Sequence, residues 1–251
     1  MLVTARMKIW KVLPELDIAV DIQSSGLTVE DFLEDDFSSI RHLEFFYHET
    51  IWNNLKTSKL PTQLESLNMH LADRKGIAAL LLQFGASLRK LSLNEVGAHG
   101  VDLKRVSELC PKLRVLQLRS VSLVENSHQQ ANFRRLEELV WDDVDSGVDG
   151  SLAAFLSSVP NLEKLEVNCQ QFPLDDLRHM IKLIIEKNVL SSLQSLRWNF
   201  NRLTPQNIFI QLAAVIKVAS AMLPKLKGLN LTYESHPVLK VVSIAAQMFG
   251  I

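Results

Sequence analysis

The stretch "CPKLRVLQLRS" occupies residues 110–120 and combines two apolar spacings. Leu113, Leu116 and Leu118 follow the pattern L-x-x-L-x-L. Because successive side chains of an extended segment point to opposite faces, Leu116 and Leu118 share one face, and Gln117 and Arg119 share the other. The stretch therefore predicts a β-strand with one apolar and one polar face.

The same pattern recurs along the whole chain. Its copies begin 23 to 33 residues apart, and most spacings fall within the roughly 20 to 29 residues that one leucine-rich repeat requires. We therefore predict one leucine-rich-repeat domain over residues 1–251, made of about nine repeats. The repeats start at Leu13, Ile40, Leu64, Leu88, Leu113, Leu136, Leu162, Leu193 and Leu226. The segment "LPELDIAVDI" is assigned to the first strand, and no N-terminal stretch has the pattern of an F-box.

Stacked repeats of this kind predict the fold class, an α/β leucine-rich-repeat solenoid. Parallel strands are expected on the concave face of a curved horseshoe and helices on its convex face. Helical spacing or capping signals occur in residues 101–109, 150–159, 173–188 and 204–222. Thr204 and Pro205 suit the start of the last helix, whose length explains final repeat spacings of 31 and 33 residues. Trp141 and Trp198 stand at inward positions and are predicted to fill the core.

Composition limits the function. There are 27 basic and 28 acidic side chains, so nothing favours general binding to nucleic acid or to an anionic membrane. Cys110 and Cys169 lie in different repeats and form no disulfide framework, which favours a cytoplasmic or nuclear location. No stretch has the character of a signal peptide or a membrane span. Motifs for phosphate binding, nucleophilic catalysis or metalloprotease chemistry are missing, so we predict no enzyme, no cofactor and no metal.

Polar residues alternate with the core residues of each strand and are predicted to face the concave side, where they would bind a protein partner. The candidate partner-binding residues are His42, Glu44, Phe46, Asn68, His70, Lys90, Asn94, Gln117, Arg119, Glu138, Asp142, Lys164, Glu166, Arg197 and Asn199. The same register also places Glu15, Asp17, Ser66, Ser92, Asn168, Ser195, Asn230 and Thr232 on this face.

Several of these residues leave two interpretations open. Phe46 is either an aromatic anchor for a partner or part of the core between two repeats. His42 and His70 fall on neighbouring strands, but two histidines without a third ligand make a poor metal site. Arg119 and Asp142 are close enough in register for an ion pair or for contact with a partner.

Three further segments and one repeat position lie outside this set of candidate residues. Residues 30–36 are acidic and are predicted to be a solvated surface, with docking of a basic partner as the alternative. Residues 141–150 are predicted to form a loop before a capped helix rather than a calcium loop. The position eight residues after the repeat start would carry an Asn or Cys ladder, and Asn201 is its one match. The same position in four other repeats holds Val96, Val121, Val144 and Gln170. The apolar stretch 241–248 near the C-terminus would favour self-association if exposed.

The segment "ELCPKLRVLQLRS" is similar to the Cys-Pro-x-Leu-x-x-Leu-x-Leu repeats of F-box leucine-rich-repeat proteins. This resemblance implies a protein substrate bound on or near the concave face. In that family a separate F-box module binds the adaptor of an SCF-type ubiquitin ligase, so this adaptor is an expected partner if such a module lies upstream. A free-standing leucine-rich-repeat regulator, such as a GTPase-activating protein, and a fragment of an immune or hormone receptor remain alternatives.

Overall fold

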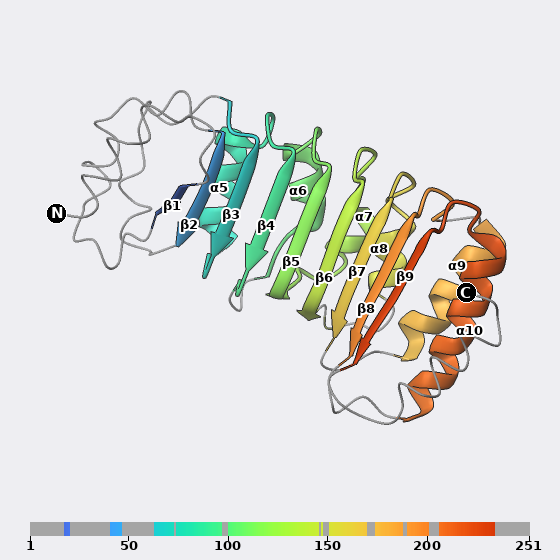
Figure 1. The fold of residues 1–251 in the computed structure, drawn as a ribbon. Coiled ribbons are helices and arrows are strands. Elements are labelled where there is room, and N and C mark those ends of the chain that lie inside the picture. Colours follow the sequence, from blue (N-terminus) through green and yellow to red (C-terminus); the bar gives the residue numbers. More distant parts are fainter. Residues whose placement is uncertain are drawn as a thin grey trace, which may run out of the picture.

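The fold is an α/β solenoid built on one parallel sheet of nine strands, which follow one another in sequence order (Figure 1). The computed structural model describes residues 18–20, 41–46, 63–72, 74–96, 100–145, 147, 151–169, 174–187, 190–200 and 206–233. The strands are β1 (Ile18–Val20), β2 (His42–Phe46), β3 (Ser66–His70), β4 (Lys90–Asn94), β5 (Val115–Ser122), β6 (Glu138–Asp145), β7 (Lys164–Cys169), β8 (Ser195–Phe200) and β9 (Gly228–Tyr233).

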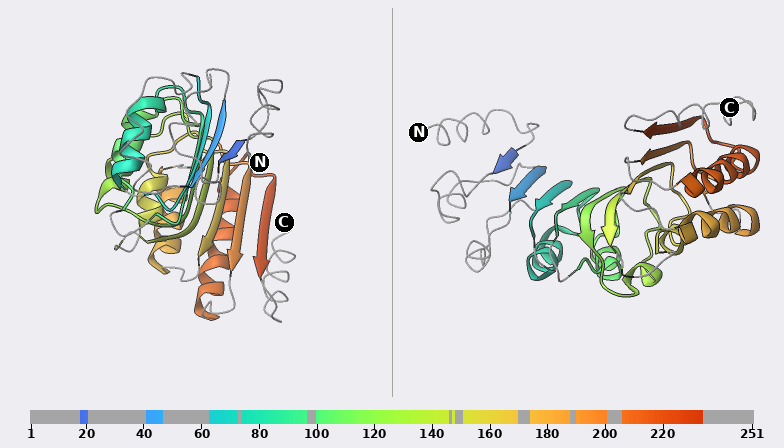
Figure 2. Two further views of the ribbon diagram at one scale, coloured as in Figure 1. Left: turned by 90° about the vertical axis from the view of Figure 1, so that its left-hand side faces the viewer. Right: turned by 90° about the horizontal axis from the view of Figure 1, so that it is seen from below.

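A helix lies between each pair of successive strands from β3 onward. All the helices cover one face of the sheet, and the strands follow the inner side of an arc with the helices outside (Figure 2). Both features match the predicted horseshoe and are compatible with a leucine-rich-repeat solenoid. The helices are α5 (Arg74–Phe84), α6 (Leu103–Leu109), α7 (Ser127–Gln130), α8 (Ser151–Leu156), α9 (Leu174–Lys187) and α10 (Gln206–Met222).

The predicted helices are confirmed as α6, α8, α9 and α10. The last two have 14 and 17 residues, which accounts for the long final spacings. Helix α5 and the four-residue α7 were not predicted from the sequence, α7 because it is too short to show a helical period. Of the helices that the structure describes, none has both the length and the apolar character needed to cross a membrane.

The register of the sheet follows the repeat pattern from β2 to β9. The second apolar residue of each repeat pairs with its counterpart on the next strand, as Leu91 does with Leu116. The first strand differs from the prediction, because Ile18 rather than Leu16 pairs with Leu43. The first repeat is therefore shifted by two residues, a shift that keeps the same side chains on the same face. Residues Glu15 and Asp17, predicted on this strand, lie outside the described residues.

The leucines of the pattern form one continuous core between the sheet and the helices. Leu88, Leu116 and Leu118 have no exposed surface. Trp141 and Trp198 are buried as predicted, with exposed fractions of 3% and 0%. The core has no break between repeats, so each repeat completes the burial of its neighbours.

A turn closed by a backbone hydrogen bond precedes each strand from β4 to β9. In the repeat of Leu113, the backbone N–H of Leu113 donates to the carbonyl of Cys110 over 3.1 Å. Pro111 follows the first residue of this turn, the place where its fixed φ fits best. The recurring Cys-Pro, Val-Pro and Leu-Pro pairs before the strands are thus parts of turns as well as helix stops. The equivalent bonds join Leu88 to Gly85, Leu136 to Phe133, Leu162 to Val159, Leu193 to Leu190 and Leu226 to Leu223.

In four successive strands, from β3 to β6, one residue has a left-handed backbone conformation with a positive φ, and the regular alternation of side chains ends there. Each lies seven residues after the repeat start, and none is a glycine. This conformation shifts the alternation of side chains by one residue, so the side chain of the next residue points into the core instead of toward the surface. Val96 and Val121, which stand at that next position, are buried with exposed fractions of 4% and 1%. The four left-handed residues are Leu71 (φ 57°), Glu95 (φ 53°), Ser120 (φ 49°) and Asp143 (φ 49°).

The predicted loop over residues 141–150 is wrong in its first half. Strand β6 continues to Asp145, and Val144 pairs with Val121 of β5. The end of this strand was not predicted, because three aspartates interrupt the apolar and polar alternation that indicates a strand. The left-handed Asp143 explains how the strand keeps Val144 packed against the core despite them.

Candidate protein-binding face

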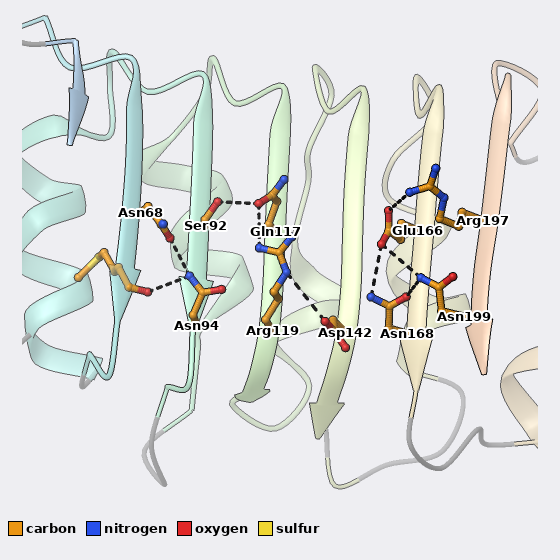
Figure 3. A network of polar contacts seen from close by, with 11 residues as sticks. Asn68, Ser92, Asn94, Gln117, Arg119, Asp142, Glu166, Asn168, Arg197 and Asn199 are labelled. Atoms are coloured by element: carbon orange, nitrogen blue, oxygen red, sulfur yellow. Dashed lines mark hydrogen bonds and ion pairs between the residues drawn. The ribbon is translucent and has the colours of Figure 1, made fainter. Parts of the chain in front are cut away.

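The face of the sheet that the helices leave uncovered carries side chains two, four and six residues after each repeat start. We call it the concave face. Strand alternation places these side chains opposite the core leucines, as predicted. In β4, for example, Leu91 and Leu93 are fully buried, whereas the side chain of Lys90 is exposed. Figure 3 shows that the polar side chains of β3 to β8 lie in three groups on this face.

The first group joins β2, β3 and β4. Asn68 donates from Nδ2 to Oε1 of Glu44 over 2.9 Å, and His70 Nε2 lies 2.8 Å from the same oxygen. Asn94 then donates from Nδ2 to Oδ1 of Asn68 over 2.6 Å. Asn94 is almost fully buried by its neighbours, with an exposed fraction of 7%. These contacts hold four predicted residues in one fixed arrangement.

The second group lies at the centre of the sheet, on β4, β5 and β6. Ser92 donates to Oε1 of Gln117 over 2.9 Å, and Arg119 donates to the same oxygen from Nη1 over 3.1 Å. The Nε atom of Arg119 lies 3.9 Å from Oδ2 of Asp142, which confirms the ion-pair interpretation. Both side chains are partly exposed, so we expect this pair to contribute only ~0–1 kcal/mol to stability.

The third group joins β7 and β8 around Glu166. Arg197 donates from Nη1 to Oε2 of Glu166 over 3.4 Å, and Asn199 donates to Oε1 over 3.4 Å. Asn168 makes a further contact with Oε1 over 3.4 Å and accepts a hydrogen bond from Asn199. One carboxylate therefore organises three side chains. On the neighbouring strands Lys164 forms an ion pair with Glu138.

Two groups on this face have shifted pKa values. Burial raises the pKa of the Asp142 carboxyl above its ordinary value, although a hydrogen bond from Asn168 and the charge of Arg119 oppose the shift. The hydrogen bond and charge of Glu138 raise the pKa of the Lys164 amino group. A lysine whose pKa is raised stays protonated at neutral pH, so the shift at Lys164 creates no general base there.

Two apolar residues that were not among the predicted candidates also lie on this face. Val115 of β5 and Val140 of β6 are half-buried and lie diagonally on neighbouring strands, since Val115 pairs with Glu138 and Gln117 pairs with Val140. Such diagonal neighbours lie about 7–8 Å apart, within contact distance of a common ligand. The repeat register alone would have identified them, because they stand two and four residues after their repeat starts.

Some predicted residues are not brought together. His42 pairs in register with Ser66, whereas His70 pairs with Phe46 at the other end of β2, so the two histidines are four positions apart. The side chains of Phe46 and Thr232 are not described, and the acidic residues 30–36 lie outside the described residues. Within the described part of the chain, no three His, Cys, Asp or Glu side chains gather in a way that could hold a metal ion.

The buried Cys110 stabilises the end of a helix, and its thiol is unreactive at neutral pH. It caps α6, donating from its backbone N–H to the carbonyl of Val106. Burial raises the pKa of its thiol to about 12, so the nucleophilic thiolate is suppressed at neutral pH.

A scan of known protein families matches none of them to this chain, and a search of the curated proteins finds no relative.

Proposed function

We propose that this protein is a non-catalytic scaffold that binds another protein on its concave face. The observation that carries the proposal is the half-buried pair Val115 and Val140, which lies beside polar side chains that hydrogen-bond to one another. A small apolar centre inside a polar rim is typical of protein interfaces.

The fixed polar groups favour this function for an energetic reason. A side chain that is ordered only on binding costs about 0.5–1.5 kcal/mol, and side chains such as Gln117 and Arg119 are already bonded to each other. Their mixed charges suit a folded protein or peptide better than a uniform polyanion. The face can therefore present several donors and acceptors with little loss of entropy.

We further propose that the bound protein is a substrate of an SCF-type ubiquitin ligase. The support is the similarity of "ELCPKLRVLQLRS" to repeats of F-box leucine-rich-repeat proteins, with Cys110 and Pro111 in the turn before β5. On this proposal the repeats hold the substrate, and an F-box module joined to them binds the ligase adaptor.

The binding face is tested by quantitative affinity purification from cells, comparing the wild type with the double variant Val115→Glu and Val140→Glu. Burying two unpaired carboxylates under a partner is strongly unfavourable, so the recovered amount of each specific partner should fall at least tenfold. The matched control is Leu82→Glu on α5, a side chain with an exposed fraction of 63% on the convex side. Retention of every partner by the double variant, with far-UV circular dichroism unchanged, contradicts the proposal.

The ligase role needs a separate measurement. Proteins that depend on Val115 and Val140 for capture should become more abundant, and less ubiquitinated, when the protein is depleted from cells. Unchanged abundance and ubiquitination of those same proteins would contradict the ligase role and leave a scaffold without it.

A further inference from the structure

A second charged surface lies at the edge of the sheet where β4, β5 and β6 begin, the upper edge in Figure 1. Turns before β5 and β6 carry Lys112, Arg134 and Arg135, and Lys90 opens β4. All four side chains are exposed. We call these four residues the basic edge.

The backbone holds the components of the basic edge side by side. The N–H of Arg114 donates to the carbonyl of Arg89 over 2.8 Å, and the N–H of Glu137 donates to the carbonyl of Arg114 over 2.8 Å. A side-chain hydrogen bond also holds the turn at Arg134, because Asn161 donates from Nδ2 to the carbonyl of Arg134 over 2.7 Å. Neighbouring parallel strands lie about 4.8 Å apart, so the three strand starts span only about 10 Å.

The basic edge is not neutralised by its surroundings. Nearby Arg89 and Arg114 have acidic partners, Glu65 at 3.9 Å and Glu137 at 3.3 Å. The carboxylate of Glu138 is already paired with Lys164. Lys90, Lys112, Arg134 and Arg135, in contrast, form no ion pair with any residue that the structure describes.

The charge is local and polarised along the strands. At the opposite ends of the same strands, the exposed side chains Glu95, Asp143 and Asp145 are acidic. The whole chain has a net charge of −1, so the basic edge is not part of a generally positive surface. A cationic patch of this kind attracts an anionic ligand and fixes its orientation.

The acidic side chains within the patch decide which anion fits. Glu65 and Glu137 lie beside the cations, paired with Arg89 and Arg114. A nucleic acid carries a phosphate on every nucleotide, so these two carboxylates would repel it. A protein segment can place its carboxylates opposite the cations and leave neutral residues elsewhere. An extended segment of about four residues covers 10 Å at roughly 3.3 Å per residue.

We propose that the basic edge is a second binding site, which holds an acidic segment of a partner protein. The segment would lie across the starts of β4, β5 and β6, with its carboxylates near Lys90, Lys112, Arg134 and Arg135. The site adjoins the concave-face centre, because Lys90 pairs in register with Val115. Its other three cations lie in the turns before β5 and β6, so the site does not depend on the function proposed above.

The test uses a fluorescently labelled peptide of ten glutamates and fluorescence anisotropy at low and physiological salt. The triple variant Lys112→Glu, Arg134→Glu and Arg135→Glu should bind the peptide at least tenfold more weakly than the wild type. The matched control reverses three exposed lysines on the convex helices, Lys75, Lys104 and Lys182, with the same change in net charge.

The outcomes separate specific binding from general attraction. Loss only in the triple variant, with binding retained by Val140→Glu on the concave face, supports the proposal. Equal weakening in the triple variant and the control, or no weakening in either, overturns it. Tighter binding of a ten-residue oligothymidylate than of the peptide, lost in the triple variant, would also overturn it in favour of a nucleic-acid site.

Discussion

Individual residues adopt conformations here that their chemistry disfavours. The left-handed region costs a residue with a Cβ atom roughly 1–2 kcal/mol relative to its ordinary conformations. Leu71, Glu95, Ser120 and Asp143 accept this cost at the same place in four successive repeats. The gain is that the following residue enters the core, as Val121 does with an exposed fraction of 1%.

Replacing Ser120 with glycine should therefore stabilise the protein. Glycine reaches a φ of 49° without strain, and after its greater entropy loss on folding is included we expect a gain of roughly 0.5–1 kcal/mol. Urea denaturation measures the free energy of unfolding. The control is Ser122→Gly, the last residue of β5, whose φ is not positive and where glycine should destabilise. Equal effects at the two positions would contradict the left-handed assignment.

A buried histidine makes stability depend on pH. His128 in α7 has an exposed fraction of 1%, and its Nδ1 atom has no hydrogen-bond partner among the described residues. Burial lowers the pKa of His128 below its ordinary value of 6.5, so the folded protein keeps the ring neutral. The unfolded chain binds a proton at higher pH than the folded one, and stability is lost as pH falls below about 6.5.

Urea denaturation at pH 7.5, 6.5 and 5.5 checks this prediction in the wild type and in His128→Leu. The wild type should lose stability relative to the variant as the pH falls, because only the wild type must keep a histidine neutral. A difference between the two proteins that stays constant over this range would show that His128 does not titrate on unfolding.

Between elements, one helix caps the start of another. The backbone N–H of Ala153 near the start of α8 donates to Oδ1 of Asp176 in α9 over 3.0 Å, and Asp176 is 2% exposed. The carboxylate satisfies an N–H that has no partner within α8, and its charge suits the positive end of the helix. The two repeats are therefore coupled through a buried polar contact as well as through the core.

Asp176→Ala should destabilise the protein by about 1–3 kcal/mol, since it leaves a buried N–H without an acceptor. Asp176→Asn keeps an oxygen at this position and should cost less. Thermal unfolding followed by circular dichroism ranks the three proteins. An alanine variant as stable as the asparagine variant would mean that the contact with Ala153 contributes nothing.

The sequence predicts elements well where its repeat pattern is strong. Leucine spacing specifies the register from β2 to β9, because a slip by one residue would expose the whole apolar face. It does not specify β1, where Leu16 with Ile18 and Ile18 with Val20 both alternate correctly. The cap from Asp176 could not be predicted, because it joins residues 23 positions apart through a contact that no local pattern records.

Across the whole molecule, repetition explains both the shape and the candidate site. Stacked strands align equivalent residues into rows, so the sequence predicts which side chains share the concave face. It does not predict how they pair, since Glu166 contacts residues of both its own and the next strand. It also did not single out Val115 and Val140, because Phe46 was the one large apolar side chain expected at an outward position.

Site-specific photo-crosslinking in cells tests whether the concave face binds a protein. A benzoylphenylalanine at position 140 replaces Val140 at the centre of this face, and one at position 82 replaces the exposed Leu82 on α5. We expect position 140 to form covalent adducts with discrete proteins that position 82 does not form. Adducts at position 82 alone, or the same adducts at both positions, would contradict binding through the concave face.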